Sequence, residues 1–597
     1  MSFLPTSAAE AGAQLDVVLV TGDAYVDHPA WGVALIGRWL EAHGFSVGII
    51  GQPDWRDVEA FRVLGRPRLF FGITAGAMDS MVNRFTASRH IRRQDAYTPG
   101  GVVGARPDRA TIPYCAAVRQ AYRGVPVVIG GIEASLRRFA HFDWWQDKTR
   151  GSMLIDSKAD LLVFGMGERA VLEIARRLDD GAAVADCRDI RGICYAFGAR
   201  EELDTATNTV ELPSHDECRA DPKALAKATV GVYRESNPHC AQRLVQRHGQ
   251  RMVVQNPPAL PLDTASLDRL YELPYAYAAH PSLSAPVPAL ASVAGSVTIT
   301  RGCAGGCSFC SLTAHQGREL VCRSPDSVLR ELHTHVQHPD FKGIVSDMGG
   351  PTANMYSMAC MDEAAGAICR RRSCLMPKRC RHFSTDHGPL ISLLRAARQV
   401  PGVRRVFINS GIRTDLADED FIQELAAHHV QGQLSVAPEH GAASTLRAMN
   451  KPPVSVFLAF KKRFEEASRR AGKDQYLVPY FMAAHPGTGE KEAIELAIFL
   501  KHHGFRPRQV QLFMPTPGTL STAMYVSGID PYTGQNVHVA RGNRARSRQR
   551  ALMLYWKSEE APHVREALKA WGREDLIGKG ASKLVSFGPA FGAWQRR

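Results

Sequence analysis

Three cysteines in one short glycine-rich segment are the residues of this chain best suited to chemistry. Cys303, Cys307 and Cys310 have the spacing CxxxCxxC and directly follow a strand-like segment, residues 296–300. Thiolates at this spacing can bind three irons of a cubane cluster, which leaves the fourth iron without a protein ligand. An iron with an open coordination position can bind S-adenosylmethionine. The spacing therefore predicts an iron–sulfur cluster that takes part in chemistry.

Zinc, a disulfide scaffold and unliganded core thiols are the alternatives for these cysteines. Structural zinc sites usually combine two CxxC or CxxH pairs, and no second pair lies at the customary distance, so zinc would need a distant fourth ligand. The chain has 13 cysteines in 597 residues, an odd number and too few for a disulfide scaffold. Residues 1–14 also lack the basic and apolar parts of a signal peptide. The sequence favours the iron–sulfur cluster.

A second group of cysteines has the spacing CxxxxCxxxxxC and consists of Cys369, Cys374 and Cys380, with Cys360 nearby. Six arginines and lysines and no acid lie between Cys369 and His382. Such a basic surrounding lowers thiol pKa values and suits an anionic cluster or an anionic substrate. The spacing matches no ferredoxin pattern, which favours structural cysteines over an auxiliary cluster or a zinc site.

The composition is that of a soluble globular protein, with 45% hydrophobic and 22% charged residues. The length allows about three or four domains. No apolar run reaches the length of a membrane span, so no membrane partner is expected. We expect a cytoplasmic protein, because a reducing compartment keeps thiolates available for a cluster.

The net charge of +14 is concentrated toward the end of the chain, where residues 541–597 hold 13 Lys and Arg against 5 Asp and Glu. RNA phosphates could bind such a region. A solvated helix face is the favoured alternative, because no aromatic-interleaved RNA motif accompanies the charges. The densest part consists of Arg541, Arg544, Arg546, Arg548 and Arg550.

The first part of the chain alternates strand and helix patterns, which predicts a doubly wound, Rossmann-like α/β domain over residues 1–180. Glycines follow two of its strands, at Gly130-Gly131 and at residues 165–167, and tight turns are their favoured role. Residues 181–290 are rich in turn formers and are predicted to be a connector. The expected strands are 16–21, 46–50, 69–73, 125–131 and 160–164, and the expected helices include 33–41 and 170–178.

From residue 291 to 545 the alternation of strand and helix becomes regular. Six such units predict a partial (β/α)6 barrel, whose active site lies at the carboxyl ends of its strands. Residues 546–597 are predicted to be a small basic C-terminal extension. The expected strands are 297–300, 343–348, 404–409, 433–437, 476–482 and 509–514, and the helices between them are 324–336, 390–398, 421–429, 454–471 and 491–503.

Polar residues and glycines follow these barrel strands and could hold a cofactor beside the cysteines. Glycine lets backbone carbonyls approach an amino group, a guanidinium suits a carboxylate, and a carboxylate can accept from ribose hydroxyls. Together, at consecutive strand ends, they point to one site. The candidates are Gly349, Gly350, Ser410, Arg413, Glu439 and His485.

The chain resembles the radical SAM superfamily through CxxxCxxC after a strand, the aromatic Phe309 before the third cysteine, and six βα units. More narrowly, it resembles the YgiQ family of that superfamily. The strings that carry this likeness are Gly22-Asp-Ala-Tyr-Val-Asp-His-Pro29, Tyr97-Thr-Pro-Gly-Gly101, residues 301–310 with Thr313-Ala-His-Gln-Gly317, Ser373-Cys-Leu-Met-Pro377, Ala437-Pro-Glu-His440 and Tyr480-Phe-Met-Ala-Ala-His-Pro-Gly487.

The resemblance implies a [4Fe-4S] cluster on the three cysteines and reductive cleavage of S-adenosylmethionine to methionine and a 5′-deoxyadenosyl radical. That radical would abstract hydrogen from a substrate, which the resemblance leaves open. It also implies an external electron donor, flavodoxin-like or ferredoxin-like. By the same carry-over, Gly349 and Gly350 would meet the methionine amino group, Ser410, Arg413 and Glu439 the carboxylate and ribose, and Phe309 the adenine side.

The N-terminal domain is similar to the cobalamin-binding domains that precede many radical SAM cores. Those domains often carry DxHxxG with a cobalt-ligating histidine, whereas this chain has Asp27-His28-Pro-Ala-Trp-Gly32, one residue out of register. This departure counts against cobalamin and favours a substrate-binding or structural domain. The alternatives to a radical SAM enzyme that abstracts hydrogen are a cobalamin-dependent methyltransferase and a non-catalytic zinc or iron–sulfur scaffold.

Overall fold

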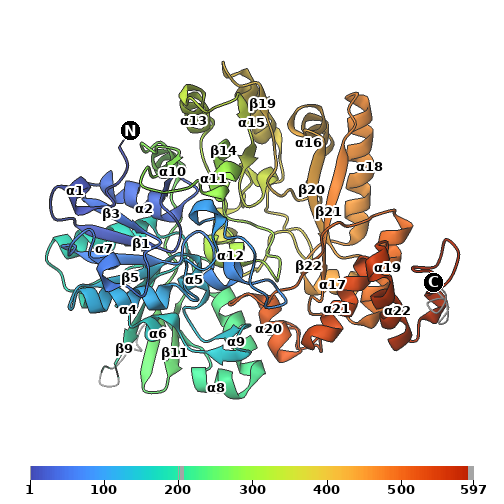
Figure 1. Cartoon of the computed structure of the whole chain (residues 1–597), viewed down its shortest axis with the longest axis horizontal. Helices are drawn as coiled ribbons and strands as arrows, with labels where there is room; N and C mark the ends of the chain where they lie inside the picture. The colour runs from blue at the N-terminus through green and yellow to red at the C-terminus, as the bar shows by residue number, and fades with distance from the viewer. Residues whose placement is uncertain (1, 199–200, 202–207, 589–597) are drawn as a thin grey trace, which may run out of the picture.

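The computed structural model describes residues 2–198, 201 and 208–588. The N-terminal half lies on the left in Figure 1 and the barrel on the right, with α12 (Ser311–Gln316) between them. The two halves share one hydrophobic core. Tyr525 from the second half packs against Phe142 and Trp144 from the first, with ring centroids 6.0 and 5.5 Å apart. The halves therefore pack as one body.

The N-terminal half is built on a nine-stranded sheet in the order β10-β11-β12-β9-β8-β5-β4-β1-β3. Its first five strands in the sequence are parallel, as predicted for a doubly wound domain. Continuous apolar runs form them because both faces of the sheet are covered by helices. They are β1 (Val17–Thr21), β3 (Val47–Gly51), β4 (Phe70–Thr74), β5 (Val127–Gly130) and β8 (Leu161–Val163), with α2 (Gly32–Glu41), α4 (Thr111–Ala121), α5 (Gly131–Leu136) and α7 (Glu168–Asp179) among the helices.

Much of the segment predicted to be a connector belongs to this sheet. Four strands between residues 193 and 255 extend it, and β9 and β12 run antiparallel to their neighbours. These strands are short and many turn formers surround them, so the composition favoured a connector. The strands are β9 (Ile193–Phe197), β10 (Thr209–Glu211), β11 (Arg243–His248) and β12 (Arg251–Gln255), and α9 (Pro222–Arg234) lies between β10 and β11.

The second half contains the predicted barrel strands, although the first two are each broken in two. The ladders β14–β18, β17–β19, β20–β21 and β21–β22 are all parallel. The strands are β14 (Ser296–Thr298), β15 (Thr300–Arg301), β17 (Ile344–Val345), β18 (Asp347–Gly349), β19 (Arg405–Val406), β20 (Gln433–Glu439), β21 (Tyr476–Ala483) and β22 (Gln511–Leu512). The helices are α13 (Pro325–Gln337), α15 (Gly388–Gln399), α16 (Glu419–Glu424) with the π-helix η5 (Leu425–His429), α18 (Val454–Arg470) and α19 (Glu490–His502).

The basic run near the end of the chain forms a helix, as the favoured reading predicts, and its arginines are engaged within the protein. Arg544 and Arg548 pair with Glu566, and Arg550 pairs with Glu560. Arg546 is buried, with its guanidinium 4.8 Å from the ring of Trp144. The helices are α20 (Leu520–Ser527), α21 (Gly542–Met553) and α22 (Ala561–Ala570). Over the described part of the chain, no helix is both long and apolar enough to cross a membrane.

Candidate functional site

The segment that carries Cys303, Cys307 and Cys310 forms a loop between β15 and α12, which we call the cluster loop (residues 302–310). Its first residues are held by the end of α12, because Gln316 Oε1 accepts from Gly302 N at 3.1 Å and Gly317 O accepts from Cys303 N at 3.2 Å. Gly302 has φ +83°, and a Cβ there would lie 1.9 Å from Glu319 O. Only glycine fits this close backbone approach.

Side chains from distant segments hold the rest of the cluster loop. Asn450 Nδ2 donates to Gly306 O at 2.8 Å, and Ser373 Oγ donates to Gly305 O at 2.8 Å. The backbone of Ser308 donates to Met449 O at 2.9 Å. Sequence reasoning missed Asn450 as a site residue and read Ser373 only as part of a family string. The lone signal at Asn450 is its residue type, since asparagine tolerates the φ of +57° found here.

The positively charged side chains near the thiols suit an anionic cluster held by thiolates. Burial raises the pKa of Cys307, while Lys451 and Arg413 lower it, and burial raises the pKa of Cys310 to about 12. Arg413 Nη1 lies 3.7 Å from Cys307 Sγ, and Thr352 Oγ1 lies 3.4 Å from Cys303 Sγ. Thiols of this kind become thiolates when the positive charge of iron is supplied. The loop thus fits a cluster held by all three cysteines.

The guanidinium of Arg413 is held within the protein, so not all of its donors are available to a ligand. Its Nε and Nη2 donate to the two carboxylate oxygens of Asp415 at 2.8 and 2.7 Å. Asn354 binds both the backbone nitrogen and the backbone oxygen of Arg413, at 2.7 and 3.0 Å. Only Nη1 remains directed at the cluster loop, so the guanidinium acts on Cys307 from a rigid position.

Two buried polar groups at the end of β20 lack hydrogen-bond partners in the part of the chain that is described. They are Oε2 of Glu439 and Nε2 of His440. Burial raises the pKa of the Glu439 carboxyl, and Lys451 lowers it. Glu439 also has φ +68°, an uncommon conformation for this residue type. Buried polar atoms are normally paired, so each of these two atoms would be stabilised by a polar partner.

Gly349, Gly350 and Ser410 are brought together behind the cluster loop. A Cβ on Gly349 would lie 2.3 Å from Ser410 Oγ, and one on Gly350 would lie 2.4 Å from Thr300 O. Both glycines thus allow close packing in the described conformation. Ser410 Oγ donates to Asp347 Oδ2, and its backbone nitrogen donates to Oδ1 of the same residue at 2.9 Å. Their contact with a cofactor stays a prediction.

His485 lies under Phe309, with ring centroids 6.0 Å apart. Its Nδ1 donates to Pro486 O at 2.6 Å, so Nε2 accepts from the hydroxyl of Ser521 at 2.7 Å. Burial lowers the pKa of His485 to about 3. Both ring nitrogens are therefore used inside the protein, and His485 positions Phe309 in this structure.

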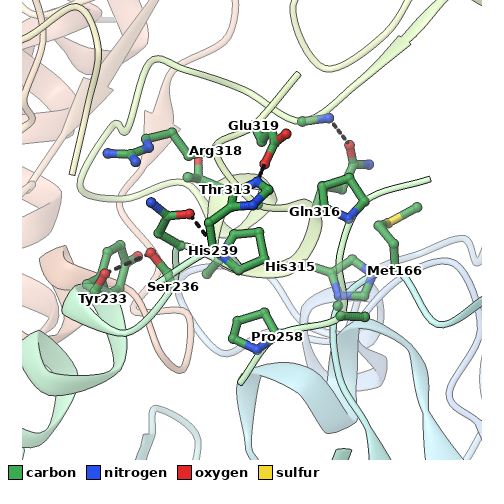
Figure 2. A pocket seen from close by; sticks show the side chains of 18 of the residues that line it. Met166, Tyr233, Ser236, His239, Pro258, Thr313, His315, Gln316, Arg318 and Glu319 are labelled. Atoms are coloured by element: carbon green, nitrogen blue, oxygen red, sulfur yellow. Dashed lines mark hydrogen bonds and ion pairs between the residues drawn. The ribbon is translucent and has the colours of Figure 1, made fainter. Parts of the chain in front are cut away.

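A cavity of about 660 Å³ lies between the two halves of the chain, beside the cluster loop (Figure 2). His239, Ser236 and Pro258 from the first half face Thr313, His315 and Arg318 from the second half across it. His239 and Glu319 pair across the gap at 3.0 Å. The six predicted cofactor residues at the barrel strand ends and the three cluster-loop cysteines do not line this cavity.

The second group of cysteines lies on the wall of this cavity. Cys360, Cys369, Cys374 and Cys380 all line it. Burial raises the pKa of Cys374 to about 11, and the other three add to this rise because they lie within electrostatic reach, while Arg318 lowers it. The backbone nitrogen of Cys374 donates to Ala304 O at 3.0 Å, so this group adjoins the cluster loop.

The strand-end glycines of the N-terminal sheet serve close packing. A Cβ on Gly131 would lie 2.3 Å from Thr74 Oγ1, and one on Gly165 would lie 3.3 Å from His315 O in α12. His315 also bonds through Nδ1 to Ser135 Oγ at 3.1 Å. The prediction that these glycines serve tight turns fits Gly131, whereas Gly165 forms part of the cavity wall.

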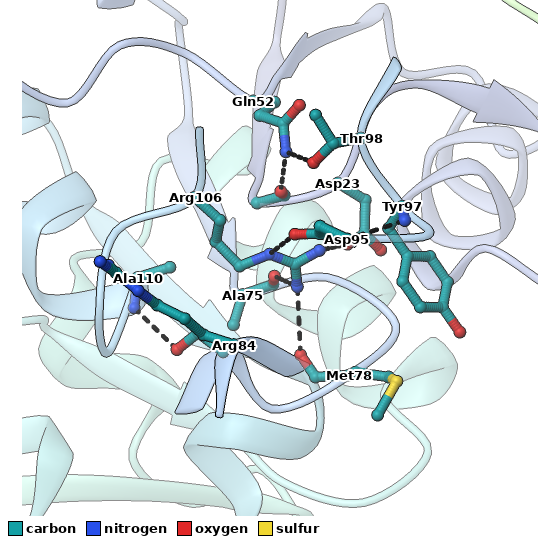
Figure 3. A network of polar contacts seen from close by, with 12 residues as sticks. Asp23, Gln52, Ala75, Met78, Arg84, Asp95, Tyr97, Thr98, Arg106 and Ala110 are labelled. Atoms are coloured by element: carbon teal, nitrogen blue, oxygen red, sulfur yellow. Dashed lines mark hydrogen bonds and ion pairs between the residues drawn. The ribbon is translucent and has the colours of Figure 1, made fainter. Parts of the chain in front are cut away.

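The carboxyl ends of β1 and β4 carry a buried polar network centred on Arg106 (Figure 3). Arg106 pairs with Asp23, donates to Ala75 O at 2.9 Å and lies 3.7 Å from Asp95. Burial raises the pKa of Asp23 to about 6, although Arg106 lowers it. The network ties residues 94–106 to the sheet. His28 is also buried. Its ring packs edge to face with those of Trp31 and Tyr277, with ring centroids 5.9 and 5.3 Å apart.

Family models match nearly the whole chain. "Radical SAM N-terminal" matches residues 3–296, "Radical SAM superfamily" residues 297–500, and a domain of unknown function, DUF3362, residues 508–594. Among solved structures, the cobalamin-dependent S-adenosylmethionine radical enzyme OxsB with aqua-cobalamin and S-adenosylmethionine bound aligns with a TM-score of 0.50 and 9% identity, covering 96% of this chain and 77% of that chain. That likeness concerns the fold alone.

Curated relatives match over nearly the full length. A UPF0313 protein of Geobacter sulfurreducens is 53% identical over 582 residues, which cover 96% of this chain and 96% of the relative. The UPF0313 protein YgiQ of Escherichia coli K12 is 44% identical over 650 residues, covering 98% of this chain and 88% of the relative. The chain therefore belongs to the YgiQ (UPF0313) family of the radical SAM superfamily.

Proposed function

We propose that this protein cleaves S-adenosylmethionine reductively at a [4Fe-4S] cluster on Cys303, Cys307 and Cys310 and that hydrogen abstraction from a substrate follows. One observation carries the proposal: a buried carboxylate oxygen of Glu439 without a partner among the described residues, at the end of β20, within electrostatic reach of Cys307. A buried acceptor of this kind costs free energy unless a ligand supplies a donor. Ribose hydroxyls or an amino group of the cofactor would do so.

The residues of the site hold and orient the cofactors. The three thiols would ligate the cluster, and Arg413 would stabilise the thiolate of Cys307 through Nη1. When bound, the cluster and S-adenosylmethionine supply one-electron chemistry that yields a carbon radical. Phe309, packed on His485, would cover the adenine side and exclude water from the reaction.

We further propose that the cavity beside the cluster loop receives the substrate or the part of it that reacts. Its volume of about 660 Å³ is in the range of sites that bury a drug-sized molecule. Apolar walls from Leu136, Phe139 and Phe164 would bury such a molecule, and Arg138 would favour an anionic group on it. Electrons would come from an external flavodoxin-like or ferredoxin-like donor.

Cobalamin-dependent methyl transfer is the second candidate function. It is favoured by the place of the cavity, which is lined by Gly165 and Met166 at the carboxyl end of β8, where ligands of doubly wound domains bind. The buried His28 does not favour it, because that ring faces Trp31 and Tyr277 inside the domain. Expression with cobalamin supplied separates the two candidates, since a colourless protein that still forms 5′-deoxyadenosine would exclude methyl transfer through cobalamin.

The main proposal is tested by anaerobic reconstitution of the wild type and of a Cys307→Ala variant. EPR of the reduced cluster is recorded with and without S-adenosylmethionine, and 5′-deoxyadenosine is measured after addition of a reductant. We expect a spectrum that changes with S-adenosylmethionine, and cleavage product that is lost in the variant. A cluster whose EPR spectrum does not change when S-adenosylmethionine is added would refute the proposal in favour of an iron–sulfur scaffold.

A further inference from the structure

Four cysteines that the sequence spreads over residues 360–380 form one group in the structure. All four line the cavity between the two halves of the chain, and Cys374 lies within electrostatic reach of the other three. Backbone contacts close the segment on itself, because Cys380 N donates to Cys374 O at 2.7 Å and Cys360 pairs with Phe383 in an isolated β-bridge. The grouping thus arises from the fold.

The charges around this group suit an anionic occupant. Arg318 and Arg372 line the same cavity, and Nη1 of each is buried without a hydrogen-bond partner across the described ranges. Arg318 also donates through Nη2 to Cys369 O at 3.3 Å, which fixes its guanidinium beside the cysteines. An iron–sulfur cluster with four thiolate ligands is an anion, so the unpaired Nη1 donors of these two arginines would stabilise it.

In the described conformation these cysteines do not converge on a single ion. Zinc needs four ligands that converge within about 2.3 Å of one point. Within residues 2–198, 201 and 208–588, no three His, Cys, Asp or Glu side chains converge in that way. The cluster-loop cysteines are no exception, although their spacing is that of a cluster motif. Within each of the two groups, the cysteines do not converge on one ion. A four-iron cluster at the centre of each group would account for this arrangement.

We propose that Cys360, Cys369, Cys374 and Cys380 bind a second [4Fe-4S] cluster, in which the protein ligates every iron. Full ligation leaves no open position for S-adenosylmethionine, so this cluster differs in role from the one on the cluster loop. The two lie next to each other, because Cys303, Cys374 and Cys380 pack against one hydrophobic group that includes Leu375 and Phe383. The second cluster would form part of the wall of the cavity.

The experiment counts iron and sulfide in the anaerobically reconstituted full chain. We expect about eight irons per chain in the wild type and about four in the Cys303→Ala/Cys307→Ala/Cys310→Ala variant, whose EPR spectrum does not respond to S-adenosylmethionine. The Cys369→Ser/Cys374→Ser/Cys380→Ser variant should also hold about four irons and keep that response. Cys240→Ser is the matched control, because Cys240 is partly buried in a neighbouring loop and does not line the cavity.

A wild type with about four irons, together with a cluster-loop variant that binds none, would overturn the second site. One zinc per chain retained by the cluster-loop variant would overturn it as well. If the serine variant does not fold, the iron content of the cluster-loop variant decides alone. About eight irons without any 5′-deoxyadenosine would refute the proposed function and leave the second cluster intact.

Discussion

Gly306 tests how strictly the cluster loop depends on its contact with the second group of cysteines. Its φ is +60°, and a Cβ at this position would lie 2.3 Å from Arg372 O, a backbone atom that cannot rotate away. Gly306→Ala must therefore separate the two segments by about 1 Å to reach ordinary van der Waals contact. A misplacement of that size beside reacting groups costs about 100-fold in rate. We expect a loss of this order in 5′-deoxyadenosine formation, with less iron retained.

Gly528→Ala is the matched control for this change. Gly528 has φ +71° at the end of α20, and a Cβ there would meet nothing within 4 Å among the described residues. This variant carries the same left-handed strain, about 1–2 kcal/mol, without the clash. Rates of 5′-deoxyadenosine formation are compared by mass spectrometry at equal protein concentration, after iron analysis. A Gly306→Ala protein with the full rate and iron content of Gly528→Ala would refute the reasoning.

Three further variants probe the site and its support. Glu439→Gln should weaken S-adenosylmethionine binding by about tenfold or more, measured by equilibrium dialysis. Because burial raises the pKa of the Glu439 carboxyl in the folded state, the native protein binds this proton more tightly than the unfolded chain does. The cofactor-free wild type should therefore lose stability as pH rises above 4.5, the usual pKa of a glutamate, whereas the variant should not. Arg301→Met should cost about 3–5 kcal/mol in urea unfolding, because it leaves the buried Glu168 carboxylate unpaired, and adding Glu168→Gln should restore part of it. Arg413→Met should lower the reduction potential of the cluster in an EPR-monitored titration, since it removes the cation beside Cys307; an unchanged potential would contradict that role.

The sequence predicted the strand order along the barrel and the parallel half of the N-terminal sheet, because buried parallel strands read as continuous apolar runs. It could not reveal β11 and β12, which are short; β11 also carries Arg243, Gln246 and Arg247 around only two apolar residues. A composition rich in turn formers then favoured a connector. Short strands at the side of a large sheet have too little apolar signal to compete with the turns that flank them.

At the site, the cysteines were predictable from their spacing and the strand-end residues from their position. The sequence could not predict that two nitrogens of Arg413 donate hydrogen bonds to Asp415. Nor could it predict that both ring nitrogens of His485 form hydrogen bonds within the protein. Such pairings depend on side chains that meet only in three dimensions. The sequence identified the second group of cysteines, but only the fold shows that all four line one cavity.

The anchors of the cluster loop have a consequence for the order in which the protein is made. Its backbone is bound by Ser373, Met449, Asn450 and Ser521, the last through Ser521 N and Ser308 O at 2.8 Å. When the ribosome has added the three cysteines, none of these four partner residues has been synthesised. All of these contacts can form only after residue 521 has been added, so we expect the loop to reach its described conformation late in synthesis.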